Sequence, residues 1–219
     1  MIRALWDRLS AYKEARYAGY RKDAAQAFEK HELLHEIYWN DGGERHPGPL
    51  RASWEIGIPG SSNFRVNIVA GAQGHLSLTG DIDSAAWAYG PPNAFARLWW
   101  MACRSTDSYF MEKLRIGSGH SEWSNWDEEA ACLEILARRR DEHIGAEVAR
   151  EATRMIESGC YREDAIRGYV ADEAADRDAW EWAGDLGAVK SSAPFYLQAA
   201  LKRCDELVSG WPRICEVHS

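Results

Sequence analysis

One stretch, residues 63–81, constrains the fold more than any other part of the chain. Its sequence, NFRVNIVAGAQGHLSLTGD, alternates apolar and polar residues on both sides of a glycine-containing turn, which predicts a β-hairpin. The apolar positions of this alternation are Phe64, Val66, Ile68, Leu76 and Leu78. Because one face of such a hairpin is apolar, we expect helices from elsewhere in the chain to cover that face.

Further strands are predicted on both sides of the hairpin. Residues 52–58 place Trp54 and Ile56 on one face, and residues 84–89 suit a strand less strongly because of their alanines. Together these segments predict a four-stranded antiparallel meander. Before it, apolar residues recur every three or four positions up to about Trp39, which predicts helix, with Gly19 dividing it into two.

The rest of the chain is predicted to be mostly helical. Asn93 suits a helix N-cap, and Asn125-x-x-Glu128 resembles a capping box. The expected helices cover residues 94–103, 107–116, 130–144, 146–158, 163–175 and 193–209. The fold class is therefore α+β: an antiparallel meander sheet packed by an N-terminal helix and a larger C-terminal helical region.

A boundary is expected in residues 117–125, which are rich in glycine and serine. It would separate residues 1–117, with the sheet, from residues 118–219, an acidic helical region. A single continuous domain is the alternative.

Charge is distributed unevenly along the 219 residues. The net charge of −8 lies mainly in residues 126–219, which carry twenty Asp or Glu against twelve Lys or Arg. Such an acidic surface argues against direct nucleic-acid binding. It fits either solvation or docking onto a basic partner, including a protein that itself binds nucleic acid.

The five cysteines are scattered and form no C-x-x-C pair, as expected of reduced thiols. The N-terminus lacks an apolar signal core, and no run of about 18 apolar residues occurs. We therefore expect a cytoplasmic protein with no membrane association.

The most specific catalytic motif is His31-Glu32-Leu33-Leu34-His35, the H-E-x-x-H pattern of zinc peptidases. On a helix both histidines can bind zinc while Glu32 activates a water molecule, and Asp41 or Glu55 could supply a third ligand. Tyr38 stands where one branch of these enzymes has glycine, and the predicted sheet follows the motif rather than preceding it. The alternative is two histidines on a half-buried helix face.

Two other groups of charged residues have simple structural interpretations. Asp81 and Asp83 follow Gly80 and would lie near Glu55 if the two strands are adjacent, so the three carboxylates could bind a cation. The simpler interpretation is a turn, in which a Gly-Asp dipeptide is common. The triplet 138–140 is all arginine; successive helical residues point in different directions, which favours a solvated helix flank.

Tryptophan is unusually abundant, with eleven residues. Indoles are enriched at protein interfaces, so some are expected to be binding anchors. The adjacent Trp99 and Trp100 point about 100° apart on a helix, so at least one could be exposed.

Four segments carry a resemblance to a known family. They read EKHELLHEIYWNDGGERH, SSNFRVNIVAGAQGHLSLTGDIDSAAWAY, FARLWW and SAPFYLQAALKRCDEL. In that order they resemble an uncharacterised family of bacteriophage, prophage and actinobacterial proteins, in which a helix ending H-x(5-7)-D-G-x-x-R-H leads into F-x4-W-P-G-x-L-x-I-x-G-D-M-G. The chain departs from this pattern at residues 70–73 and at Asp83.

The resemblance implies an accessory protein of a mobile element. Such proteins often bind a host protein, for example a component of a defence system such as CRISPR–Cas, and the family supplies no catalytic residue to carry over. The leading hypothesis is a non-enzymatic binder of a host protein complex that uses Trp99, Trp100 and the acids Glu163, Asp172 and Asp176. The rival is the zinc hydrolase built on His31, Glu32 and His35.

Overall fold

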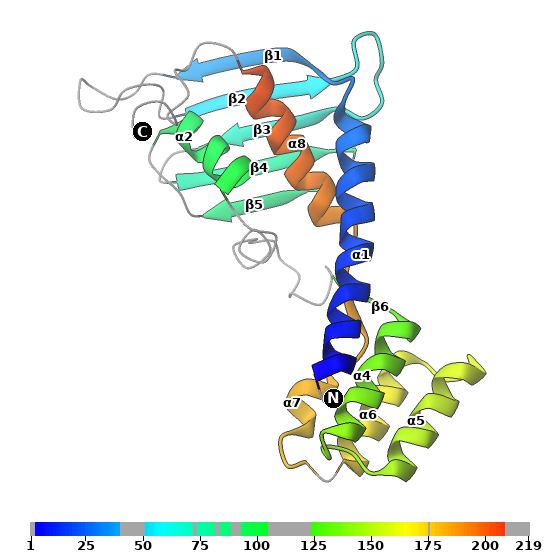
Figure 1. Cartoon of the computed structure of the whole chain (residues 1–219). Coiled ribbons are helices and arrows are strands. Elements are labelled where there is room, and N and C mark those ends of the chain that lie inside the picture. Colours follow the sequence, from blue (N-terminus) through cyan, green and yellow to red (C-terminus); the bar gives the residue numbers. More distant parts are fainter. Residues whose placement is uncertain are drawn as a thin grey trace. The chain divides into compact units, whose positions relative to one another are not determined.

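The computed structural model describes residues 3–39, 51–71, 74–81, 84–88, 93–104, 124–174 and 176–208 (Figure 1). The chain forms two compact units. The helical unit comprises Met1–Ala18 and Ser121–Ser191, and the sheet unit comprises Gly19–His120 and Ser192–Ser219. The division predicted at residue 117 stays a prediction, because residues 105–123 lie outside the described part.

Helix α1 (Arg3–Phe28) contributes residues to both units. It passes through Gly19 without a break, so the expected division into two helices is wrong. A glycine inside a helix costs only about 1 kcal/mol. Ending one helix and starting another would leave up to four N–H and four C=O groups without helical partners, which outweighs that cost.

Strand β1 (Glu32–Trp39) replaces the last eight residues of the expected N-terminal helical stretch. The helix prediction for these residues is wrong: α1 ends at Phe28, and the His31 N–H closes the turn onto the Phe28 carbonyl at 3.0 Å. Pairing with strand β2 (Arg51–Gly57) stabilises the extended form, which the run Ile37, Tyr38 and Trp39 also favours. The spacing of apolar residues along the sequence does not reveal such long-range strand pairing.

The sheet is a five-stranded antiparallel meander in the order β1-β2-β3-β4-β5. The remaining strands are β3 (Val66–Ala70), β4 (His75–Gly80) and β5 (Ala85–Ala88). The predicted fold class is confirmed, with β1 added to the four expected strands.

The central hairpin has the predicted alternation. Ile68 pairs with Leu78, and both side chains are fully buried, as are those of Val66 and Leu76. Phe64 is the exception: it precedes β3 with a φ of 58° and is 49% exposed, so it does not extend the buried row.

Three helical segments lie on one face of the sheet (Figure 1): α2 (Ala94–Trp99), the π-helical turn η2 (Trp100–Arg104) and α8 (Ala193–Leu207). Asn93 is the N-cap of α2, as predicted, and its side chain accepts hydrogen bonds from the N–H groups of Phe95 and Ala96. The Phe95 ring packs 5.8 Å from that of Trp54, which identifies the covered face as the apolar one.

Buried polar groups tie this covering layer to the sheet. Arg97 of α2 is fully buried and donates hydrogen bonds to the carbonyls of Gly71 and His75 beside the hairpin turn. Its burial lowers the pKa of the guanidinium. Arg203 of α8 similarly donates to the His31 carbonyl at 2.9 Å. Each guanidinium thus connects a covering helix to backbone carbonyls of the sheet unit, and the His75 carbonyl accepts from the Gly71 N–H as well.

In the described part of the helical unit, four helices accompany the first part of α1. They are α4 (Glu128–Arg140), α5 (Ala146–Ser158), α6 (Glu163–Glu173) and α7 (Ala179–Ala183). The same unit also contains a short antiparallel strand pair, β6 (Ser124–Trp126) and β7 (Ala188–Lys190). The core of the unit includes Ile135, Ile156, Ile166 and Leu186.

Asp127, and not the expected Asn125, is the N-cap of α4. Its carboxylate accepts a hydrogen bond from the Ala130 N–H at 2.8 Å and also contacts Arg16 and the Tyr12 hydroxyl of α1. The capping box was wrong because Asn125 is held in β6, where it pairs with Val189. One buried carboxylate thus fixes two helices.

No helix in the described part of the chain combines the length and hydrophobicity required to span a membrane. The described cysteines Cys103, Cys132, Cys160 and Cys204 form no disulfide. Burial raises the pKa of the Cys204 thiol well above its ordinary value, which suppresses its reactivity.

Replacing Ile68 by alanine tests the packing of the hairpin. Ile68→Ala should lower the free energy of unfolding by about 2–5 kcal/mol, because it removes buried methyl groups and leaves a cavity. Val69→Ala is the matched control, since Val69 is the next residue and is 39% exposed on the opposite face. Urea denaturation measures both; similar losses for the two variants would contradict the assigned faces.

Candidate functional site

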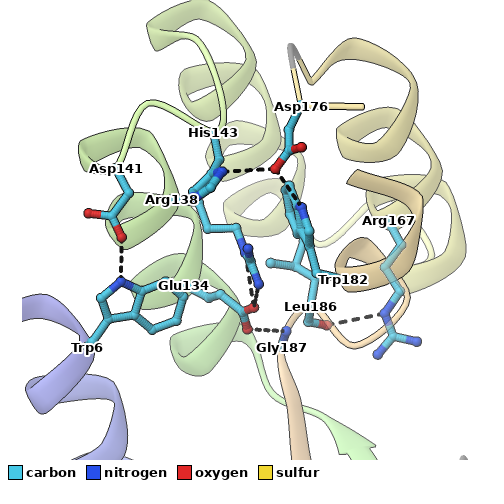
Figure 2. Close-up of polar contacts among 10 residues, drawn as sticks. All are labelled: Trp6, Glu134, Arg138, Asp141, His143, Arg167, Asp176, Trp182, Leu186 and Gly187. Atoms are coloured by element: carbon cyan, nitrogen blue, oxygen red, sulfur yellow. Dashed lines mark hydrogen bonds and ion pairs between the residues drawn. The ribbon is translucent and has the colours of Figure 1, made fainter. Parts of the chain in front are cut away.

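A connected set of polar contacts lies in the helical unit, among the ten residues drawn in Figure 2. We call this set the Arg138 cluster: Trp6, Glu134, Arg138, Asp141, His143, Arg167, Asp176, Trp182, Leu186 and Gly187. It joins α1, α4, α6 and α7 with the loops that follow α4, α6 and α7.

Arg138 lies between two tryptophan rings. Its guanidinium carbon is 3.8 Å from the ring centroid of Trp182 and 5.5 Å from that of Trp6. Each such cation–π contact contributes about 0.5–2 kcal/mol, more when it is shielded from water. The expected solvated flank is therefore wrong for Arg138, whereas Arg139 and Arg140 are exposed as predicted.

Glu134 is the counter-ion of Arg138. One carboxylate oxygen accepts from Arg138 Nη2 at 3.2 Å, and the other accepts from the Gly187 N–H at 3.4 Å. Gly187 has a φ of +69°, and a Cβ there would lie 2.7 Å from that of Ala131. Only glycine therefore fits this position without strain.

Asp176 holds the other side of the cluster. Its carboxylate accepts from His143 Nδ1 at 2.9 Å, from Trp182 Nε1 at 3.3 Å and from the Asp178 N–H at 3.1 Å. The backbone hydrogen bond of Asp178, followed by those of Trp182 and His143, lowers the pKa of Asp176. Asp176 is thus a fixed structural anion.

The cluster determines which way α7 faces. Trp182 is held inward by Arg138 and Asp176, and residues two apart on a helix point about 200° apart. Trp180 therefore points outward and is 71% exposed, the largest exposure among the large hydrophobic residues of the described chain. Leaving an indole in water has no packing benefit for the unit itself.

Acidic residues surround Trp180 in the sequence. Residues 172–185 carry six acids against one arginine: Asp172, Glu173, Asp176, Asp178, Glu181 and Asp185. All except Asp176 are exposed. We use the name Trp180 segment for Trp180 together with the five exposed acids: Asp172, Glu173, Asp178, Glu181 and Asp185.

The zinc motif has a different geometry from the one expected. His31 is buried before β1, with Nε2 2.8 Å from the Phe64 carbonyl, while Glu32 and His35 are exposed on β1. Four residues of extended chain span about 13 Å, so the two histidines cannot approach one ion as they would on a helix. Asp41 lies outside the described residues, and the described residues contain no group of three or more potential metal ligands.

The carboxylates near the hairpin are occupied by an arginine. Arg65 Nη1 lies 3.0 Å from Glu55 Oε1, and the Arg65 N–H donates to Asp81 Oδ2 at 3.2 Å. Asp83 lies outside the described residues. The Arg65 guanidinium is therefore the cation beside Glu55, whereas Asp81 accepts from the Arg65 backbone, in keeping with the turn chemistry considered for it.

The remaining predicted interface residues are dispersed. Trp99 is half-buried and Trp100 is 38% exposed, both in the sheet unit, whereas Glu163 and Asp172 are exposed on α6. Glu163 and Asp172 are nine residues apart, which places them on opposite sides of that helix. Sequence reasoning missed Trp180 because its exposure depends on contacts of Trp182 with distant residues.

The sheet unit also contains an open groove of about 560 Å³ between the last part of α1 and α8. Phe28 and Phe195 form part of its apolar lining, and Arg21, Lys202 and Arg203 contribute positive charge. Glu29 and Glu206 offset two of these charges, so the groove has little electrostatic preference.

Comparisons of the chain with protein-family models, curated proteins and solved structures gave no match.

Replacing Arg138 tests the cluster. Arg138→Gln should lower the free energy of unfolding by about 2–4 kcal/mol, because it removes two cation–π contacts and leaves the Glu134 carboxylate buried without its cation. Arg139→Gln is the matched control and should change stability by no more than about 0.5 kcal/mol. Chemical denaturation followed by tryptophan fluorescence measures both variants. Equal small losses in the free energy of unfolding would mean that Arg138 is solvated like Arg139, which would contradict the cluster.

Proposed function

We propose that this chain acts without catalysis, by binding a host protein or protein complex through the Trp180 segment. The exposure of Trp180 carries the proposal, since tryptophan is enriched among the residues that contribute most to protein–protein binding. The resemblance to bacteriophage and prophage proteins supports a host target. A component of a bacterial defence system such as CRISPR–Cas is one such target.

The charge of the segment indicates the kind of partner. Five exposed acids flank Trp180, and acidic surfaces accelerate encounter with basic ones. A basic surface of the kind that nucleic-acid-binding proteins present would complement it. The tryptophan would then supply most of the affinity and the acids most of the association rate.

Binding partners captured from a bacterial lysate test the anchor. Trp180→Ala should weaken binding of a stoichiometric partner by at least about tenfold, the effect of losing roughly 1.4 kcal/mol. Trp100→Ala is the control, because Trp100 is also exposed but lies in the other unit. Equal binding by the two variants would contradict the proposal.

The electrostatic part is tested with Asp178→Lys and Glu181→Lys, which leave the Arg138 cluster intact. Asp176 is unsuitable because it holds His143 and Trp182. Both reversals, and added salt, should slow association with the captured partner. An association rate that neither reversal nor salt changes would exclude steering by these acids.

A further inference from the structure

Strand β1 is an edge of the five-stranded sheet. Its backbone pairs with β2 on one side, and no other described strand pairs with it. Natural proteins protect such edges with proline, lysine, short strands or bulges, because the unpaired N–H and C=O groups can bind another strand. β1 is eight residues long and contains neither proline nor lysine.

The one irregularity of β1 lies near its start. The register shifts between Leu33 and His35, and from His35 to Trp39 the pairing with β2 is regular. This regular segment ends in apolar side chains that remain in solvent: Ile37 is 39% exposed and Trp39 is 43% exposed. Both lie on the sheet face opposite Trp54, since Ile37 pairs with Ser53 and Trp39 with Arg51.

We propose that β1 pairs antiparallel with β1 of a second copy of this chain, with Ile37 opposite Ile37. The regular segment supports this register, because Ile37 is the middle residue of His35–Trp39. All five of its residues then find partners, and the two sheets become one sheet of ten strands. A two-fold axis normal to the sheet keeps each side chain on the face it already occupies.

The side chains opposite one another in this register are compatible. Glu36 faces Tyr38 of the second copy, and His35 faces Trp39. Within one copy the Tyr38 hydroxyl already donates to Glu36 Oε2 at 2.5 Å, so a phenol and a carboxylate lie together on this face. A register centred on Glu36 would instead place two carboxylates directly opposite each other, which destabilises a strand pair.

Disulfide trapping tests the register. Opposed residues of antiparallel strands have Cα atoms about 4.5–5.5 Å apart, within the range that a disulfide spans. In a parent variant with Cys103, Cys160 and Cys215 replaced by serine, Ile37→Cys should form a dimer linked through residue 37, identified by mass spectrometry. His35→Cys is the control on the same strand, and it should not link to itself because its partner is Trp39. Efficient self-linking of His35→Cys, or none by Ile37→Cys, would overturn the proposal.

Sedimentation equilibrium of the full chain tests the dimer without cysteine chemistry. Ile37→Lys should raise the dimer dissociation constant by at least about tenfold, because two ammonium groups would face each other across the axis. Val69→Lys is the matched control: Val69 is also 39% exposed on the same face, but it lies on the internal strand β3. A monomeric parent chain, or equal dissociation by Val69→Lys, would overturn edge pairing; the second result would point to the open sheet face.

Discussion

An arginine held between two indoles fixes the arrangement of the helical unit. Arg138 contacts Trp6 from α1 and Trp182 from α7, while Glu134 neutralises it and receives the Gly187 N–H. Removing such a cation from water is costly unless its charge and its donors are satisfied. The requirement that all these partners be present together therefore fixes α7 against α4, and it decides which of the two α7 tryptophans faces solvent.

The sheet unit follows a different constraint, the burial of one face. Trp54, Ile68 and Leu78 are fully buried under α2 and α8, and the alternation leaves Ile37 and Val69 on the open face. The unit thus has an exposed strand edge with apolar character, whereas the helical unit has an exposed tryptophan among acids. The two surfaces have different chemistry, and the partners we propose for them differ accordingly: a second copy for the edge and a basic protein for the Trp180 segment.

The sequence predicted features that depend on neighbouring residues. The alternation around Ile68 and the N-cap of Asn93 need only local spacing, and both predictions are confirmed. The helix predicted for His31 to Trp39 failed because its spacing fits a helix and its long-range pairing with β2 cannot be seen locally. Arg138 was misjudged for the same reason, since Trp6 and Trp182 are far from it in sequence. The abundance of tryptophan was the available signal, although it could not say which indole is exposed.

The proposed binding surface depends on Trp182 being held inside the unit while Trp180 projects into solvent. Fluorine NMR of protein labelled with 5-fluorotryptophan measures this directly, with the two resonances assigned by Trp180→Phe and Trp182→Phe. On exchange from H₂O to D₂O the Trp180 resonance should shift as a solvent-exposed indole does, and the Trp182 resonance should shift much less. A larger solvent shift for Trp182 than for Trp180 would contradict the account.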